Sequence, residues 1–217
     1  MNLPLPMPGK VIAVGLNYKD HAAEANVPLP EVPVLFTKWT TSLIAHEENI
    51  IIPSGVTQTD WEAEFAVVIG KKAVRVSEAD ALNYVSGYTC MNDVTDREAQ
   101  SKDGQWVRSK SYDTYGPIGP RIVPASEIGD PHNLKIEARL NGKTVQSSNT
   151  SNLIFSIPFL ISYISARITL EPGDVITTGT PHGVGAFSKP PVFMKAGDVI
   201  EVEIEKIGIL RNKVVGA

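Results

Sequence analysis

Short runs of apolar and β-branched residues, separated by glycine and proline, dominate the hydrophobic pattern of this chain. Runs of this length and composition are typical of β-strands. We predict strands at residues 11–14, 33–38, 49–52, 61–71, 85–90, 134–140, 143–147, 174–178 and 198–206. Helix-forming segments are fewer and shorter, at residues 18–26, 77–84 and 156–165. The pattern therefore predicts a β-rich α+β fold with a few short helices.

Two local signals refine this prediction. Asn141-Gly142, between two of the predicted strands, is a strong hairpin-turn sequence. In the last predicted strand, Ile200, Val202 and Ile204 alternate with glutamates, as expected when only one face of a sheet meets water. The sequence contains no internal repeat or low-complexity linker, so we expect a single domain over residues 1–217.

The bulk properties limit the class of protein. The net charge of −4 and the pI near 5.6 argue against nucleic acid as a partner, because phosphate binding requires a basic surface. A single cysteine, Cys90, excludes an internal disulfide framework and fits a reducing compartment. The N-terminal segment lacks the apolar core of a signal peptide, and no stretch has the length of a transmembrane helix. We therefore expect a cytoplasmic location and no membrane partner.

Three carboxylates have the spacing of a metal site. Glu62 and Glu64 fall in predicted strand 61–71, where residues two apart point to the same face, and Asp93 follows another predicted strand. Anions this close repel and raise one another's pKa unless a cation or a shared proton joins them, and the apolar run that follows indicates a strand entering the core. Oxygen ligands without nearby histidine or cysteine suit Mg²⁺, Mn²⁺ or Ca²⁺ rather than zinc. A solvated acidic sheet edge is the alternative.

His21 and Glu24 lie three residues apart in a predicted helix, so they are neighbours on one helical face. A carboxylate beside an imidazole fixes the tautomer of the ring and raises its basicity, which suits a general base that activates water. An exposed ion pair of small energetic value is the alternative interpretation. The proline-bounded segment that follows, residues 27–33, has the composition of a mobile flap.

Two further segments carry polar groups suited to an anionic ligand. Arg97 and Gln100 lie on a predicted helical turn, and Lys110 lies in a polar stretch. Beside a metal, an arginine fork and a lysine charge suit the carboxylate of a small substrate, although both residues are also compatible with ordinary surface charge. Residues 177–185 form a glycine-rich turn whose backbone amides could face an anion, but it lacks the ending of a nucleotide-binding P-loop.

Taken together, these motifs resemble the fumarylacetoacetate hydrolase family. The chain is similar to the short, single-domain members, such as the acylpyruvases and oxaloacetate decarboxylases. The resemblance spans Lys10 to Val215 and rests on motifs in the same order: Gly15-Leu16-Asn17-Tyr18 with His21 and Glu24, Asp60 to Glu64, Asn92-Asp93 with Arg97 and Gln100, Lys110 to Asp113, and Leu170 to Asp174 with Gly183-Val184-Gly185.

The resemblance implies a mixed, rolled β-sheet around the active site, a homodimer, and a Mg²⁺ or Mn²⁺ ion that Ca²⁺ can replace. The alternation in the last predicted strand also favours pairing of two copies, because flat sheet edges invite it. The implied roles are metal binding by Glu62, Glu64 and Asp93, water activation by His21 and Glu24 on a flap at residues 18–33, stabilisation of oxygen charge by Lys110, and substrate contacts by Arg97, Gln100, Lys110 and Thr180.

We therefore expect an enzyme that cleaves a carbon–carbon bond in a small 2-oxo or β-diketo acid through a metal-stabilised enolate. Hydrolysis of an acylpyruvate ranks first because the His21–Glu24 pair is intact. Decarboxylation of oxaloacetate, isomerisation of 2-hydroxyhepta-2,4-diene-1,7-dioate and decarboxylation of 5-oxopent-3-ene-1,2,5-tricarboxylate use the same enolate and are the alternatives. A non-catalytic β-protein with a structural metal ion is an alternative of another class.

Overall fold

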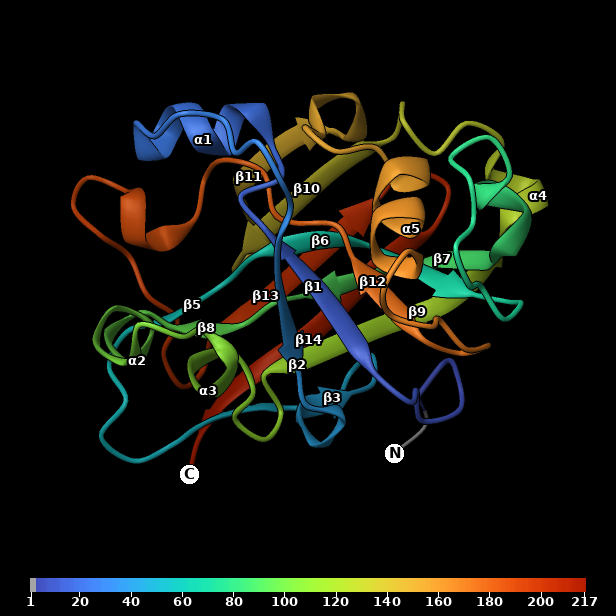
Figure 1. The fold of residues 1–217 in the computed structure, drawn as a ribbon. Coiled ribbons are helices and arrows are strands. Elements are labelled where there is room, and N and C mark those ends of the chain that lie inside the picture. The colour runs from blue at the N-terminus through green and yellow to red at the C-terminus, as the bar shows by residue number, and fades with distance from the viewer. Residues whose placement is uncertain (1–2) are drawn as a thin grey trace.

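A computed structural model describes residues 3–217 and shows two main sheets with short helices around them (Figure 1). The larger sheet has the spatial order β2 (Val34–Lys38), β1 (Val11–Gly15), β12 (Val175–Thr177), β6 (Ala63–Ile69), β7 (Val85–Asn92), β9 (Gly116–Pro124) and β3 (Leu43–Ile44). The smaller has the order β11 (Lys143–Asn149), β10 (Lys135–Leu140), β13 (Val199–Ile204), β14 (Gly208–Gly216) and β4 (Ile50–Ile52). A short ladder joins β5 (Thr59–Asp60) to β8 (Thr95–Asp96).

Both main sheets are mixed. The pairs β1–β12, β3–β9 and β14–β4 are parallel, and the remaining pairs are antiparallel. The predicted hairpin is present, with Asn141 and Gly142 both at positive φ between β10 and β11. The prediction of a β-rich α+β fold with a mixed, rolled sheet is confirmed.

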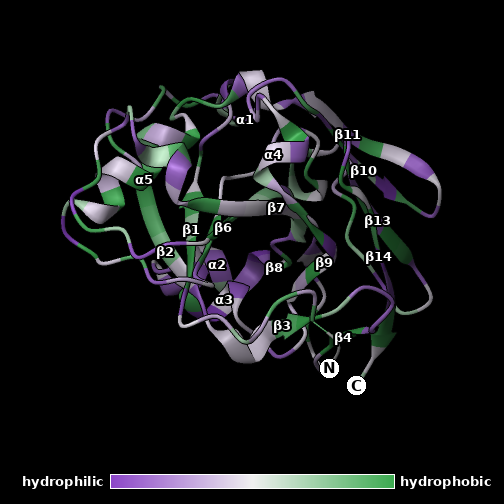
Figure 2. Ribbon diagram, turned by 90° about the vertical axis from the view of Figure 1, so that its right-hand side faces the viewer, coloured by the Kyte–Doolittle hydropathy of each residue, from purple (hydrophilic) through white to green (hydrophobic). Residues whose placement is uncertain are grey.

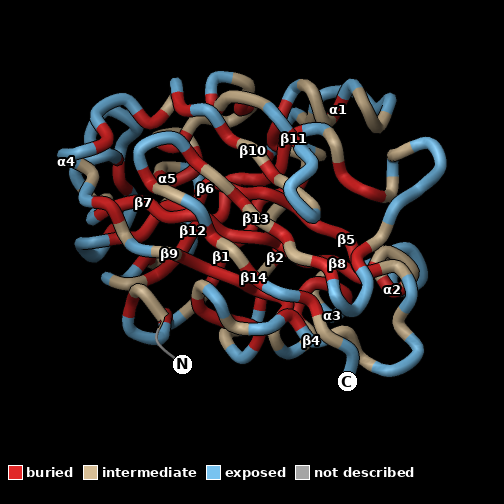
Figure 3. Tube along the Cα trace, turned by 180° about the vertical axis from the view of Figure 1, so that it is seen from behind, coloured by how far each residue is buried: buried red, intermediate tan, exposed pale blue. Residues whose placement is uncertain are grey.

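The apolar faces of the two sheets pack together to form the main core. Phe65 and Tyr88 stack at 4.9 Å within it, and Ile136 and Val202 from the smaller sheet belong to the same cluster. Strands such as β1 and β6 are therefore hydrophobic along much of their length, whereas α2 is largely hydrophilic (Figure 2). Buried chain lies inside and exposed loops lie around it (Figure 3). Burial of this apolar area is the main stabilising contribution to the fold.

The helices are α1 (Lys19–Ala25), α2 (Arg97–Asp103), α3 (Val107–Lys110), α4 (Ala125–Ile128) and α5 (Ile157–Ser165), with 3₁₀ turns η1 (Thr40–Ser42), η2 (Ala81–Tyr84), η3 (Thr150–Asn152) and η4 (Gly185–Phe187). Helix α5 begins where the sequence predicted it. The side chain of Ser156 accepts a hydrogen bond from the amide of Phe159, and Pro158 lies in the first turn. Its buried residues recur at helical spacing, so one face joins the core.

The prediction of a helix at residues 77–84 is wrong, because only the short 3₁₀ turn η2 forms there. The Ser77 hydroxyl donates to Asp80 Oδ2 and accepts from the Asp80 amide, and such local bonds compete with helix formation. Strand β9 was not predicted because it contains Pro117, Pro120 and Pro124, which cannot donate to a ladder. Strand β9 tolerates these prolines because few of its amides are needed as donors. Its pairing with β7 is irregular, and its other neighbour, β3, is only two residues long.

Strand β13 is not an edge strand, which corrects the argument for pairing that was based on it. It lies between β10 and β14, and Ile200, Val202 and Ile204 are buried in the core of the same chain. Strand β14 was missed because the buried polar residue Asn212 interrupts its apolar pattern. The homodimer implied by the family resemblance stays a prediction.

The helices of residues 3–217 are all too short or too polar to cross a bilayer. The cytoplasmic location expected from the sequence stays a prediction. The segment between α1 and β2, residues 26–33, is an irregular loop that exposes Val27, Leu29 and Val32. Its predicted movement as part of a flap at residues 18–33 also stays a prediction.

Candidate active site

The three predicted metal ligands converge at one edge of the larger sheet. Glu62 directly precedes β6, Glu64 lies within it, and Asp93 directly follows β7. Because β6 and β7 are antiparallel neighbours, with Ala63 opposite Asn92, the start of one strand meets the end of the other. One carboxylate oxygen from each residue lies within 4.8 Å of the others, and all three side chains are buried. The alternative of a solvated acidic edge is therefore wrong.

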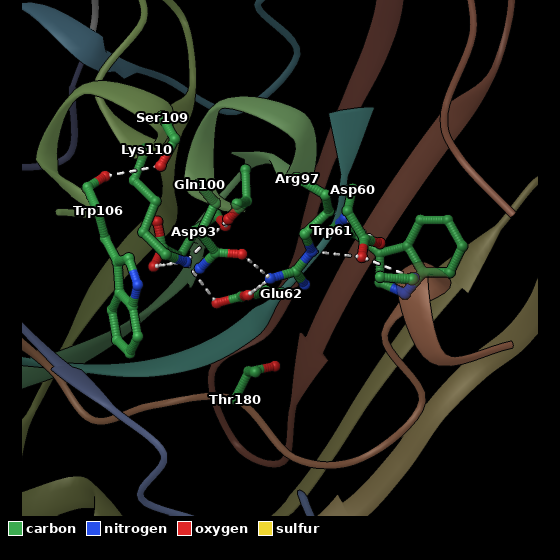
Figure 4. Close-up of polar contacts among 12 residues, drawn as sticks. Asp60, Trp61, Glu62, Asp93, Arg97, Gln100, Trp106, Ser109, Lys110 and Thr180 are labelled. Carbon is green, nitrogen blue, oxygen red and sulfur yellow. Dashed lines mark hydrogen bonds and ion pairs between the residues drawn. The ribbon is translucent and has the colours of Figure 1, made fainter. Parts of the chain in front are cut away.

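Three cationic side chains neutralise part of this buried charge, of which Figure 4 labels Arg97 and Lys110. Lys110 Nζ lies 2.9 Å from Glu62 Oε2 and 2.7 Å from Asp93 Oδ2. Lys38 Nζ lies 2.7 Å from the other oxygen of Asp93, and also donates to the main-chain carbonyl of Lys110. Arg97 Nη1 lies 2.7 Å from Glu62 Oε1. Glu62 and Asp93 therefore both have cationic partners.

Glu64 differs from the other two carboxylates. It accepts the amide of Gly179 at 3.0 Å, and no cation of the described chain forms an ion pair with it. Burial, followed by the charges of Asp93 and Glu62, raises the pKa of Glu64 well above 4.5. For Glu62, burial acts in the same direction, but Lys110 and Arg97 outweigh it and lower the pKa to about 2. The uncompensated charge of the cluster therefore falls on Glu64.

This donor set fits a hard divalent cation. The cluster consists of carboxylate oxygens only, as Mg²⁺, Mn²⁺ and Ca²⁺ prefer. With every group ionised, the carboxylates of Asp60, Glu62, Glu64 and Asp93 exceed the cations of Lys38, Arg97 and Lys110 by one negative charge. Without a metal, the raised pKa of Glu64 favours its protonation, which removes that charge. A bound divalent cation would make the net charge of the site positive, and a positively charged site favours binding of an anionic ligand. Glu62, Glu64 and Asp93 as metal ligands remain a prediction that this geometry favours.

Arg97 is held in place by Asp60. Arg97 Nε donates to Asp60 Oδ2 at 2.8 Å, and Nη1 donates to Gln100 at 3.0 Å. The second terminal nitrogen, Nη2, is buried and finds no partner among residues 3–217. A buried guanidinium nitrogen without a partner is unusual, and it is free to bind a carboxylate.

The amides of the glycine-rich turn do face anions, but these anions belong to the same chain. Asp60 accepts the amides of Gly185 at 2.8 Å and Ala186 at 2.9 Å, in addition to Arg97. Glu64 and Glu24 accept two other amides of the turn, those of Gly179 and Gly183. The turn therefore orients the carboxylates of the site instead of binding an external phosphate.

His21 and Glu24 form the predicted pair on α1. His21 Nδ1 lies 3.1 Å from Glu24 Oε2, and Glu24 Oε1 accepts the amide of Gly183 at 2.9 Å. Gly183 has φ +95, and a Cβ there would lie 2.1 Å from the carbonyl of Val145, so only glycine permits this contact. Figure 1 shows α1 beside the loop that carries Gly183. The pair is therefore anchored, unlike an exposed surface ion pair.

The predicted substrate residues share one cavity of about 390 Å³. Of the residues predicted for the site, it is lined by His21, Glu62, Glu64, Arg97, Gln100, Lys110 and Thr180. Glu24 and Asp93 lie behind the lining and contact His21 and Lys110. A larger cavity of about 570 Å³ runs along α5, but the predicted site residues do not line it. We therefore assign the smaller cavity as the candidate active site.

Three supporting residues had no role in the sequence analysis. Lys38 lies on β2 two residues after the buried Phe36, so strand alternation alone could have placed it inside. Gln146 on β11 donates to Thr180 Oγ1 at 2.9 Å and accepts the amide of Ala63. Asp60 belongs to the Asp60–Glu64 motif, but its contacts with the amides of Gly185 and Ala186 form only in the folded chain and could not be predicted from the sequence.

A family model described as "Fumarylacetoacetate (FAA) hydrolase C-terminal" matches residues 10–215. A mitochondrial oxaloacetate tautomerase of Rattus norvegicus is 48% identical over 98% of this chain and 68% of its own length. The structure of a 5-carboxymethyl-2-hydroxymuconate delta-isomerase from Mycobacterium smegmatis is 42% identical, with a TM-score of 0.87 over 97% of this chain and 80% of its own. A fumarylacetoacetate hydrolase structure from Exiguobacterium antarcticum is 40% identical, with a TM-score of 0.91 over 97% and 76%.

The fold and the buried acidic cluster are thus those of an enzyme class that acts on small organic acids. This chain belongs to the fumarylacetoacetate hydrolase family.

The metal prediction is tested by thermal unfolding of the wild type and Glu64→Gln. Mg²⁺ or Mn²⁺ at about 100 times its Kd should stabilise the wild type by about 2.7 kcal/mol, a rise in Tm of roughly 5–10 °C. Glu64→Gln should abolish this rise, because the amide cannot replace the carboxylate charge. An equal rise in wild type and variant would show that the ion binds elsewhere.

The same variant tests whether the ionised Glu64 destabilises the metal-free protein. Because its pKa is raised in the folded state, the native protein binds more protons than the unfolded chain above pH 4.5, so stability should fall as pH rises from there. Glu64→Gln should remove this part of the pH dependence. Measured in chelator between pH 5 and pH 7, the metal-free variant should be the more stable protein, increasingly so at higher pH.

The role of Asp60 is tested by Asp60→Asn. In this variant an amide NH₂ group replaces Oδ2, which accepts hydrogen bonds from Arg97 Nε and the Ala186 amide. Because NH₂ cannot accept a hydrogen bond, Arg97 should lose its position. We expect calorimetry to show that oxalate binding with Mg²⁺ weakens on the order of tenfold. Asp174→Asn is the matched control, since Asp174 is equally buried and pairs with Lys10. It should lower Tm without weakening oxalate; equal weakening by both variants would refute the assignment.

Proposed function

We propose that this protein catalyses keto–enol chemistry on a small 2-oxo acid, with tautomerisation of oxaloacetate as the first candidate reaction. The observation that carries this proposal is that His21, a candidate base, lines the same cavity as Glu62, Glu64 and Lys110. The relatives support it, because they include an oxaloacetate tautomerase and a 5-carboxymethyl-2-hydroxymuconate delta-isomerase. Both names describe proton transfer next to a carbonyl.

Each group has a part in this reaction. Bound at Glu62, Glu64 and Asp93, Mg²⁺ or Mn²⁺ would supply a Lewis acid that stabilises negative charge on the substrate oxygens. Arg97 Nη2, which lacks a partner among the described residues, would bind the substrate carboxylate, and Gln100 orients Arg97. Thr180, held by Gln146, offers a further polar contact.

His21 moves the proton. Its Nδ1 faces Glu24, so Nε2 is the nitrogen that takes the proton from the carbon beside the 2-oxo group, and the resulting imidazolium returns this proton to the enolate oxygen to give the enol. Burial opposes a charge on Lys110, but Asp93 and Glu62 outweigh burial and raise its pKa. Lys110 therefore stays an ammonium ion and stabilises oxygen charge without giving up its proton.

Hydrolytic cleavage of an acylpyruvate is the second candidate, favoured by the contact that fixes Glu24 on Gly183. In that reaction His21 would take its proton from a water molecule, which attacks the carbonyl beyond the enolate carbon. Decarboxylation of oxaloacetate is a third possibility that depends less on a base, since carbon dioxide leaves without a proton acceptor.

His21→Ala separates the two reactions that need a base from decarboxylation. Loss of the base should slow tautomerisation of oxaloacetate and cleavage of acetylpyruvate by about a hundred- to ten-thousand-fold, followed by the ultraviolet absorbance of the enols. Release of carbon dioxide should fall less. The rise in Tm with Mg²⁺ should persist, because His21 is not a proposed ligand. His182→Ala is the control, since His182 is exposed and lies outside the cavity lining. A His21→Ala enzyme with near wild-type rates would refute the assignment.

A further inference from the structure

We propose that, among 2-oxo acids longer than oxaloacetate, the site selects those whose far end is an apolar chain, and that Leu16, Val27, Trp106 and Phe187 form the subsite for this chain. This rests on the proposed function, because the chain is that of the same substrate whose carboxylate binds near Arg97. The four side chains line the cavity that also contains the acidic cluster.

Trp106 forms the inner wall of this subsite. Its ring lies so close to Gly15 that a Cβ there would come within 2.3 Å of it, so glycine is needed for the contact. The ring also packs edge-on against Phe36, with the centroids 5.4 Å apart. Lys110 Nζ lies 5.3 Å from the centroid of Phe36, so the apolar wall begins directly beside the charged groups. Figure 4 shows Trp106 on the side of Lys110 that faces away from Asp60.

Leu16 is held in an uncommon conformation at the cavity. Its φ is 51, in the left-handed region that bulky residues rarely adopt. The side chain of Asn17 stabilises this turn, because Oδ1 accepts the amide of Phe155 at 2.7 Å and Nδ2 donates to the carbonyl of Thr178 at 2.9 Å. Strained backbone of this kind clusters at ligand sites, and here it directs an apolar side chain into one.

Val27 and Phe187 leave apolar surface uncovered at the cavity. They come from separate segments, the loop after α1 and the turn η4, and they are 42% and 45% exposed. The Phe187 ring lies 5.8 Å from that of His21, so this surface adjoins the proposed base. A hydrocarbon chain that passes His21 would cover both side chains and remove their apolar area from water.

The charge distribution excludes a distant second carboxylate. Among the described residues that line the cavity, Arg97 and Lys110 are the cationic ones, and both are paired with Glu62. The second carboxylate of oxaloacetate lies close enough to the 2-oxo group to share these cations. A longer diacid would place its far carboxylate among apolar side chains, where burial of an unpaired charge is costly.

The test compares two acylpyruvates in the Mg²⁺-loaded enzyme: hexanoylpyruvate, which has an apolar far end, and succinylpyruvate, which has a carboxylate there. The rate measured is loss of the enol absorbance, which reports either tautomerisation or cleavage. We expect kcat/KM to rise about three- to fourfold per methylene from acetylpyruvate to hexanoylpyruvate. Succinylpyruvate should be at least about tenfold poorer than hexanoylpyruvate.

Val27→Lys places a cation in the subsite and should shift the succinyl-to-hexanoyl ratio by about tenfold or more towards the diacid. Val74→Lys is the matched control, because Val74 is 49% exposed and lies outside the cavity lining. It should keep the wild-type ratio. If Val27→Lys does not fold by circular dichroism, Phe187→Lys replaces it.

Two results would overturn the subsite while the proposed function stands. One is wild-type turnover of oxaloacetate or acetylpyruvate together with preference for succinylpyruvate over hexanoylpyruvate. The other is an equal substrate ratio in Val27→Lys and Val74→Lys. Absence of turnover on every 2-oxo acid would instead overturn the proposed function, and the subsite with it.

Discussion

Burial of the carboxylates of Glu62, Glu64 and Asp93 is the constraint on which the rest of the site depends. Removal of such groups from water costs several kcal/mol per ion, and partners must offset that cost. Asp93 lies between Lys38 and Lys110, and Lys110 also contacts Glu62. Each cation therefore serves two purposes: it permits burial of the anions, and it fixes their positions. Glu64 accepts a hydrogen bond from the neutral amide of Gly179 and has no ion-pair partner among the described residues, so the unfavourable energy of burying its charge is not offset by a paired cation.

The same network joins segments that lie far apart in the chain. Asp60 binds Arg97 and the amides of Gly185 and Ala186, and the neighbouring Gly183 binds Glu24 beside His21. The group proposed to bind the substrate carboxylate is therefore connected, through one loop, to the group proposed to move the proton. This connection explains why the glycine-rich turn lies at the site: its amides orient carboxylates of the same chain.

The sequence was informative where a local rule decides the structure. Strand alternation brought Glu62 and Glu64 together, helical spacing paired His21 with Glu24, and the Ser156 cap located α5. It failed where distant contacts decide. Strand alternation places Lys38 on the same face as the buried Phe36, but a lysine there is compatible with burial only because the fold brings Asp93 to its ammonium group. Asp60 contacts Gly185 and Gln146 contacts Ala63, in each case more than 80 residues away along the chain. Strand β14 contains a buried asparagine whose amide donates to the carbonyls of residues 45 and 48.

The central claim is that the three buried carboxylates form one site for a divalent cation. The most direct test is anomalous scattering from crystals of this protein soaked in Mn²⁺. The account predicts one strong anomalous peak among Glu62, Glu64 and Asp93, in contact with an oxygen of each. A peak at another acidic group, such as the half-buried glutamates of β13, with no peak at the three carboxylates, would contradict it.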